Sequence, residues 1–221
     1  MRNTFSVLIS ELKKNFPTAS DKQILKYAMH ISIPAFAVTC FPKSVPLHIP
    51  NVHYEVYDLL ESNNIEKSAI ALPRGLAKST IASFLYPMWK ILHKPAERDL
   101  FITIISESQS QSVNFLTRIK NALSNNKKIR SYFGDFGSNT AVRWREDDII
   151  LANGARISAL GTGQKVRGQI QDDTRVNIII LDDFESELNA LTPEARQRNR
   201  KWIMEAVLPS LSQTDGRLIA I

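Results

Sequence analysis

The chain has 221 residues, of which 43% are apolar and 23% charged, the balance of an ordinary globular protein with a hydrophobic core. Its formal net charge is +6, which favours polyanionic partners such as nucleic acid. No apolar run approaches the roughly 20 residues of a membrane span, and the first residues lack the apolar core of a secretory signal. A single cysteine, Cys40, excludes an internal disulfide and fits a reducing cytosol.

The first 35 residues are predicted to be helical. Apolar residues between Phe5 and Phe16 recur at i, i+3, i+4 and i+7, and Asp21 is placed to cap a second amphipathic helix. Four prolines between residues 34 and 50 then interrupt regular structure, so we expect an extended connector there. Within and just after it, His48 and the segment Tyr54–Tyr57 form either an adenine-side pocket or a packed surface turn.

From residue 65 onward, short apolar runs alternate with helical patterns, which indicates a mainly parallel sheet covered by helices on both faces. A helix is predicted to begin at Thr192, with Pro193 in its first turn. The Asn153-Gly154 pair predicts an antiparallel hairpin at the sheet edge. The predicted strands are 68–72, 99–106, 176–181 and 216–221, and further helices run from about 79 to 93 and from about 107 to 124. We therefore expect an N-terminal helical segment and connector (1–50) and an α/β domain (51–221).

The segment ALPRGLAKST (71–80) is a candidate phosphate loop. Such a loop needs backbone N–H groups around the phosphates, a lysine that reaches them and a hydroxyl for Mg²⁺, all at the start of a helix. Lys78 and Ser79 stand in that position, although Leu72 and Ala77 replace the two glycines of the usual pattern. An ordinary strand–turn–helix is the alternative. The candidate nucleotide-binding residues are Pro73, Arg74, Gly75, Leu76, Ala77, Lys78, Ser79 and Thr80.

The segment IIILDDFE (178–185) is a predicted buried strand that ends in acids. Ligands of open α/β sheets bind at the carboxyl ends of the strands, so Asp182 is a candidate Mg²⁺ ligand together with Ser79. Either Asp183 or Glu185 would then activate the attacking water. A solvated acidic turn is the alternative for this segment alone. With the phosphate loop about a hundred residues earlier, the two motifs together predict a P-loop NTPase fold that uses ATP and Mg²⁺.

Four segments, PRGLAKST, IISESQSQSVNF, GTGQKVRG and IIILDDFE, occur in an order that resembles the ATPase domain of phage large terminase subunits, the DNA-packaging motors. The resemblance covers roughly residues 65–221. It includes an arginine before the loop glycine, and it implies that Arg74 acts in cis on the γ-phosphate. It also implies ATP hydrolysis that powers packaging of double-stranded DNA.

The resemblance places further residues near the nucleotide. Arg167 matches the position of an arginine finger that acts on a neighbouring subunit. Its rivals for that role, which are otherwise DNA-facing charges, are Lys165, Arg156 and Arg175. Ser106 and Gln109 either face the nucleotide or DNA, or Ser106 simply caps a helix.

The implied partners are double-stranded DNA, further copies of the chain in a ring, a small terminase subunit and a portal protein. No membrane is implied, and the place of action is the host cytoplasm during procapsid assembly, not the virion. Large terminases also carry a nuclease domain, and only about forty residues follow Asp182. We therefore expect a truncated ATPase domain.

Two other functions compete with the packaging motor. A helicase-like ATPase acting on nucleic acid would want an Asp-Glu-x-[His/Asp] box, which the segment after residue 181 does not match. A non-catalytic, basic DNA-binding module with a degenerate loop is the third reading, motivated by Leu72 and Ala77.

Overall fold

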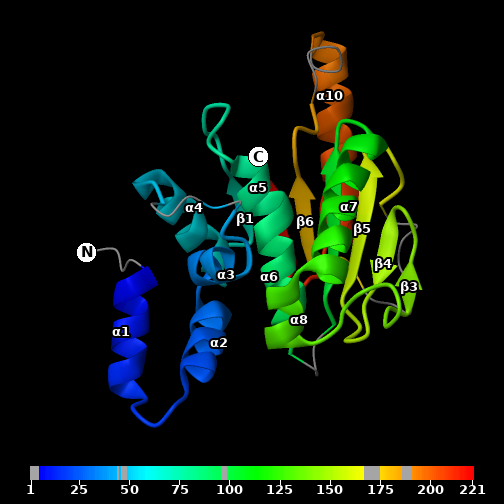
Figure 1. Cartoon of the computed structure of the whole chain (residues 1–221). Helices are drawn as coiled ribbons and strands as arrows, with labels where there is room; N and C mark the ends of the chain where they lie inside the picture. The colour runs from blue at the N-terminus through cyan, green and yellow to red at the C-terminus, as the bar shows by residue number, and fades with distance from the viewer. Residues whose placement is uncertain (1–4, 44, 46–48, 96–98, 167–174, 186–190) are drawn as a thin grey trace.

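The computed structural model describes residues 5–43, 45, 49–95, 99–166, 175–185 and 191–221. Its centre is a seven-stranded sheet in the order β1-β7-β6-β2-β5-β4-β3 (Figure 1). Five neighbouring strands, from β1 to β5 in that order, are parallel, and β4 and β3 continue the sheet in antiparallel fashion. The predicted fold class, a mainly parallel α/β sheet with an antiparallel edge, is confirmed. The strands are β1 (Lys67–Ala69), β2 (Phe101–Ser106), β3 (Arg143–Trp144), β4 (Asp148–Ile150), β5 (Arg156–Gly161), β6 (Ile178–Leu181) and β7 (Arg217–Ala220).

The predicted helices occur in the expected order, and three further helices, α3, α4 and α8, were not indicated by the sequence patterns. The helix after the candidate phosphate loop is continuous over residues 78–92, and a π-helical turn, η1 (Ile81–Leu85), lies in its middle. Pro87 follows that turn and lacks an N–H for the carbonyl four residues earlier, which accounts for the irregular register. The helices are α1 (Phe5–Asn15), α2 (Asp21–Ile31), α3 (Ile33–Cys40), α4 (Asn51–Glu61), α5 (Lys78–Thr80), α6 (Tyr86–Leu92), α7 (Gln109–Asn125), α8 (Lys127–Phe133) and α10 (Pro193–Trp202), which continues into η3 (Ile203–Val207) and η4 (Leu208–Ser210).

The predicted extended connector is wrong over residues 33–40, which form helix α3. Pro34 lies in the first turn of this helix, where a missing N–H breaks no internal hydrogen bond. Ser20, rather than Asp21, caps the preceding helix and accepts a hydrogen bond from the backbone N–H of Gln23. Proline marked the start of a helix here and not a break.

The segment Tyr54–Tyr57 lies inside helix α4 and not in a turn. Tyr57 is almost fully buried, and Tyr54 packs partly buried against the same core. His48 lies outside the described residues. The surface-turn interpretation of Tyr54–Tyr57 is therefore wrong.

The predicted strand 68–72 is shifted, because β1 ends at Ala69 and Ile70 adds only one more hydrogen bond, to Ala220 of β7. The hairpin prediction is confirmed: β4 and β5 pair antiparallel, with Gly154 at φ +79° in the turn between them. Strand β5 pairs in parallel with β2 on its other side. The antiparallel part is therefore joined directly to the parallel core.

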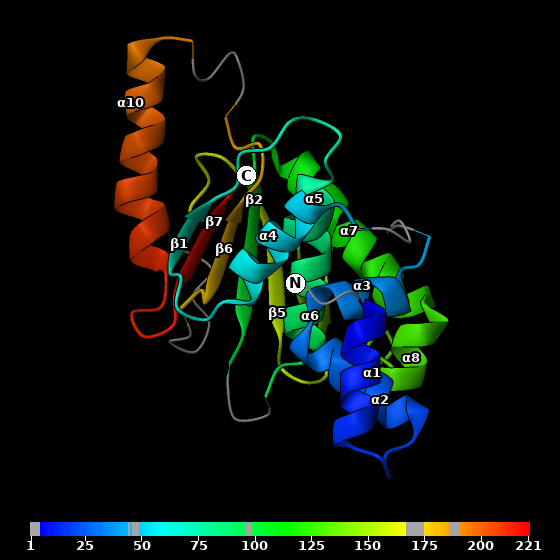
Figure 2. The same cartoon turned by 90° about the vertical axis from the view of Figure 1, so that its left-hand side faces the viewer.

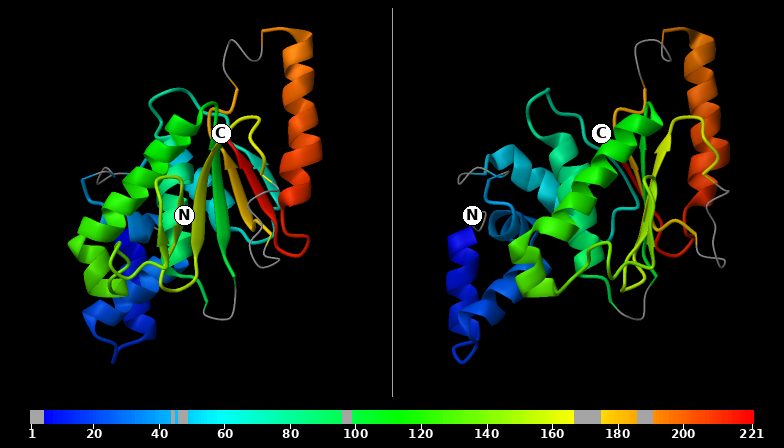
Figure 3. Two further views of the ribbon diagram at one scale, coloured as in Figure 1. Left: turned by 90° about the vertical axis from the view of Figure 1, so that its right-hand side faces the viewer. Right: turned by 45° about the vertical axis from the view of Figure 1, so that its right-hand side comes forward.

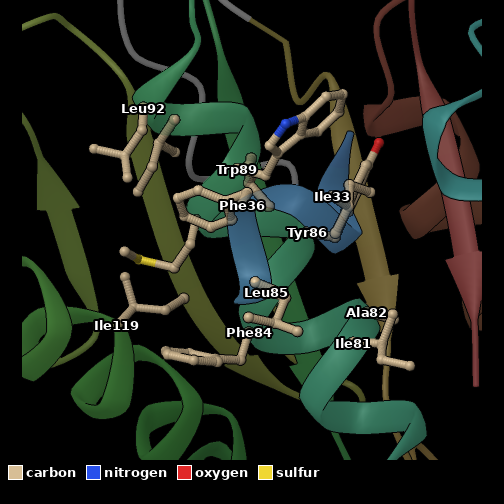
Figure 4. Close-up of a cluster of buried hydrophobic side chains, with 14 of the residues drawn as sticks. Ile33, Phe36, Ile81, Ala82, Phe84, Leu85, Tyr86, Trp89, Leu92 and Ile119 are labelled. Carbon is tan, nitrogen blue, oxygen red and sulfur yellow. The ribbon is translucent and has the colours of Figure 1, made fainter. Parts of the chain in front are cut away.

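Two hydrophobic cores lie on opposite faces of the sheet. The larger one packs α3, α4, α6, α7 and α8 against one face, and Figure 4 shows Phe36, Phe84 and Ile119 among its buried side chains. The smaller one packs Trp202 and Val207, from the end of α10 and from η3, against the other face. Figures 2 and 3 show the N-terminal helices and α10 on opposite sides of the sheet.

Residues on both sides of the expected boundary at residue 50 share the larger core, since Phe36 and Tyr57 belong to the same cluster as Ile104. The division into 1–50 and 51–221 remains a prediction. Within the part of the chain that the structure describes, no helix has the length and apolar character needed to cross a membrane.

Candidate nucleotide-binding site

The candidate phosphate loop and the acidic segment lie at the same edge of the sheet. The loop over residues 73–77 follows β1, and Asp182 follows β6, so both lie where parallel strands end (Figure 1). Strand β7 lies between β1 and β6. The carboxyl edge of an open α/β sheet is the usual position of a ligand site, and the sequence-predicted residues converge on it.

The loop has the left-handed backbone turns of a curled structure. Gly75 has φ +87°, and Ala77, at the second glycine position of the usual pattern, has φ +53°. An alanine in this region is strained, because its Cβ crowds the backbone. Alanine here thus adopts the conformation that glycine supplies in the usual pattern.

Lys78 begins the helix that follows the loop, and its ammonium group bends back over it. Lys78 Nζ donates to the carbonyl oxygen of Leu72, and to that of Pro73 at 3.3 Å. The loop also contacts α4. The Nε2 atom of the buried His53 lies at hydrogen-bond distance, 3.0 Å, from the carbonyl oxygen of Leu76. The lysine charge is therefore held over the loop.

Ser79 and Asp182 are in direct contact, although 103 residues separate them: Ser79 Oγ donates to Asp182 Oδ1 at 2.9 Å. Ser83, one helical turn later, donates to the second oxygen, Oδ2, at 2.5 Å. The Asp182 side chain is buried, and burial raises the pKa of its carboxyl group, while the hydrogen bonds from Ser83 and Ser79 lower it. The two predicted metal ligands therefore lie together, with both oxygens of the carboxylate oriented by hydroxyls.

The two candidates for water activation have different surroundings. Asp183 is exposed, has φ +48°, and its carbonyl accepts a hydrogen bond from the backbone N–H of Glu107. Glu185 is also exposed, and its Oε1 accepts a hydrogen bond from Asn199 Nδ2 at 3.1 Å. The first is fixed through its backbone and the second through its side chain, so both stay candidates.

The basic residues proposed to act on the nucleotide lie in different parts of the molecule. Arg74 is exposed on the loop, and Arg167 lies outside the described residues. Arg156 is the first residue of β5 and so lies at the amino ends of the parallel strands, away from the candidate site. Its Nε lies 2.8 Å from an Asp148 carboxylate oxygen. Arg175 precedes β6, also at the amino ends of the strands, and donates to the Pro209 carbonyl oxygen. Of the three rivals for Arg167, only Lys165 follows the carboxyl end of its strand.

Ser106 does not cap a helix, because Ser108 is the N-cap residue of α7 and accepts from the backbone N–H of Gln111. Ser106 is the buried last residue of β2. Gln109 contacts neighbouring polar residues: its Nε2 donates to Asp147 at 3.2 Å, and its Oε1 accepts from Gln164 at 3.0 Å. These contacts tie the start of α7 to the turn before β4 and to the segment after β5.

A close backbone approach also holds α7 against β5. A Cβ atom on Gly161 would lie 2.8 Å from the backbone nitrogen of Gln109, closer than side-chain carbons approach. Only glycine fits at the end of β5.

Sequence reasoning missed three polar residues at this edge. Ser83 lies four residues after Ser79, a helical spacing that could have indicated a shared face. Asn199 and Thr162 had no such signal, since their partners are distant in sequence. The Thr162 hydroxyl donates to the carbonyl oxygens of Phe184, at 2.8 Å, and of Ser106, at 3.2 Å, and so joins the segments after β5, β6 and β2.

The strand order and the site together define an α/β fold of the P-loop NTPase type. Two solved structures of the Thermus phage P74-26 large terminase ATPase domain are similar to this chain. An arginine-to-alanine mutant form has 14% sequence identity and a TM-score of 0.50, over 78% of this chain and 64% of that domain. A second form has 14% identity and a TM-score of 0.46, over 80% of this chain and 70% of the other.

The chain thus has the fold of the large terminase ATPase domain, as the four motifs predicted, and spans 64% of the length of the first of these structures. No protein-family model matches the chain, and no curated protein sequence does.

Proposed function

We propose that this chain binds ATP with Mg²⁺, hydrolyses it, and uses the energy to move double-stranded viral DNA during packaging. The contact between Ser79 and Asp182 is the observation that carries the proposal. It brings a hydroxyl at the start of the loop helix to a carboxylate at the end of a central strand, which is the pair that P-loop NTPases use for magnesium.

The residues present fit a magnesium–nucleotide ligand. Hydroxyl and carboxylate oxygens are the donors that Mg²⁺ prefers, and Ser79 and Asp182 supply one of each. Bound there, Mg²⁺ would neutralise charge on the phosphate oxygens. The residues 73–80 would surround the phosphates with backbone N–H groups, and Lys78 would exchange the loop carbonyls for phosphate oxygens.

Hydrolysis needs a group that orients or deprotonates water, and Asp183 or Glu185 would perform it. Arg74, exposed on the loop, would stabilise charge on the γ-phosphate in cis. Arg167 would do so for a neighbouring copy of the chain. Of these residues, Arg74, Asp183 and Glu185 follow the carboxyl ends of β1 and β6.

Packaging as the use of this energy is supported by the terminase-like fold and by the net charge of +6. The partners that fit are double-stranded DNA, a ring of further copies, a portal protein and a small terminase subunit, in the cytoplasm of the host cell. The non-catalytic alternative is motivated by Ala77. Against it, Ala77 adopts a left-handed backbone that a glycine would adopt, so the residue does not prevent the loop from curling.

A steady-state ATPase assay tests the proposal. The wild-type chain, Lys78→Ala and Lys127→Ala are compared with and without double-stranded DNA. Lys127 is an exposed lysine on α8 and serves as the matched control. We expect Mg²⁺-dependent turnover in wild type and Lys127→Ala, its loss in Lys78→Ala, and stimulation by DNA. Equal turnover in all three proteins would reject the phosphate-loop assignment, and turnover indifferent to DNA would reject the motor.

A further inference from the structure

Helix α10 carries an unusual density of positive charge. Four of its ten residues are cationic and only one, Glu194, is acidic. All four cations are exposed, whereas Ala195 and Asn199 face inward. The cations, which we call the basic face, are Arg196, Arg198, Arg200 and Lys201.

The basic face wraps the solvent side of the helix. At 100° per residue, Arg196 and Arg200 fall on one side of the buried stripe, and Arg198 and Lys201 fall on the other. None of Arg198, Arg200 and Lys201 forms an ion pair with a residue that the structure describes. The charges of these three residues are therefore available to an anionic partner.

The charge density matches that of duplex DNA. Residues 196–201 rise by about 7.5 Å along the helix axis. Duplex DNA carries about one negative charge per 1.7 Å of its axis, so roughly four phosphate charges occupy the same length.

The basic face is also tied to the candidate site. Helix α10 extends past the carboxyl ends of the strands in Figures 1 and 2. The candidate loop and Asp182 follow strands β1 and β6 at that same end. Asn199, on its inward side, donates to Glu185, three residues after Asp182. A partner bound to the helix would therefore act on a side chain that is a candidate for catalysis.

We propose that the basic face of α10 binds the backbone phosphates of double-stranded DNA and that the Asn199–Glu185 hydrogen bond links this contact to the nucleotide site. This inference rests on the proposed function for its DNA partner. Arginine and lysine contacts to phosphate position a protein on DNA without reading sequence. Binding should therefore be sequence-independent and strongly dependent on salt.

DNA affinity measured without nucleotide tests this inference separately from hydrolysis. Fluorescence anisotropy of a labelled 30-base-pair duplex is followed over a range of salt for wild type, Arg200→Gln/Lys201→Gln, and Lys127→Gln/Lys128→Gln. The last pair is an exposed lysine pair on α8 with the same loss of charge. Glutamine favours helix, so both variants should fold, and circular dichroism checks this.

We expect the α10 variant to bind roughly tenfold more weakly and its salt slope to fall by about 2, since two phosphate contacts are lost. The control should bind like wild type. Equal losses in both variants, or no binding by wild type, would overturn the inference. Competition by polyglutamate as strong as that by unlabelled duplex would overturn it in favour of an acidic protein partner. ATP turnover of wild type and Lys78→Ala shows separately whether the proposed function holds.

Discussion

Ser79 donates its hydroxyl hydrogen to Asp182 across 2.9 Å, and the same carboxylate accepts a second hydrogen bond from Ser83 at 2.5 Å. Two turns of one helix therefore orient both oxygens of an acid that follows a central strand. In the buried surroundings of Asp182, such hydrogen bonds fix a side chain strongly. The two hydroxyls hold the carboxylate in place, which suits a metal ligand.

The two acids after Asp182 can be separated by kinetics. Asp183→Asn and Glu185→Gln both keep the size of the side chain and remove its charge. The variant that lacks the water-activating acid should bind nucleotide as tightly as wild type. Its turnover should fall by at least about 10²-fold, in line with general-base catalysis. Turnover and nucleotide affinity are measured for each variant. If both variants turn over like wild type, neither acid has this role.

Ala77 gives a prediction about stability. Its φ of +53° is strained for alanine, so Ala77→Gly should raise the free energy of unfolding by up to about 1 kcal/mol. The matched control, Ala122→Gly within the last turn of α7, should lower it by up to about 1 kcal/mol. Chemical denaturation measures both. A destabilised Ala77→Gly variant would show that the loop does not adopt the left-handed turn.

Glu61 predicts a pH dependence of stability. Burial raises the pKa of its carboxyl group from 4.5 to about 7, while the hydrogen bond from the Ile33 backbone N–H lowers it and the charge of Asp58 raises it. The folded state therefore prefers protonated Glu61, and this stability is lost as pH rises from 4.5 through about 7.

Glu61→Gln keeps an oxygen for Ile33 and cannot ionise. Relative to wild type, its free energy of unfolding should rise across this pH range by on the order of 1 kcal/mol, after allowance for solvent screening. Denaturant unfolding at several pH values measures the difference. Parallel profiles for the two proteins would show that Glu61 ionises as freely in the folded chain as in the unfolded one.

Arg167 predicts cooperation between chains. An arginine finger supplied by a neighbour contributes about 10³–10⁵ in rate, so specific activity should rise with protein concentration. Lys78→Ala is inactive but still carries Arg167, and mixing it with Arg167→Ala should restore turnover. Rates are measured for each protein and for the mixture over a range of concentration. A concentration-independent rate with a fully active Arg167→Ala would assign this arginine to another role.

The sheet and the order of the motifs were predictable because they follow local patterns. Buried parallel strands appear as continuous apolar runs, such as Ile178–Leu181, and Asn153-Gly154 is a local turn signal. Helix α3 was not predicted, because Pro34 is a helix breaker in the interior but is tolerated in the first turn, and only packing distinguishes the two cases. The burial of Tyr57 likewise depends on how α4 packs and not on a local sequence pattern.

The candidate site likewise contains residues that local motifs predict and residues that only packing brings there. Lys78, Ser79 and Asp182 belong to motifs with fixed spacing, so the sequence predicted them and their proximity. Asn199 reaches Glu185 from a helix whose position depends on the packing of Trp202 and Val207 against the sheet, and no spacing rule encodes that contact.

Thermal unfolding with and without ATP and Mg²⁺ tests the central claim, that Lys78, Ser79 and Asp182 form a magnesium–nucleotide site. A ligand at a hundred times its dissociation constant stabilises a protein by about 2.7 kcal/mol, which for a chain of this length raises Tm by roughly 5–10 °C. Wild type and Lys127→Ala should be protected only when both ATP and Mg²⁺ are present, whereas Lys78→Ala and Asp182→Asn should lose most of the protection. Equal protection of all four proteins, or protection of none, would contradict the account.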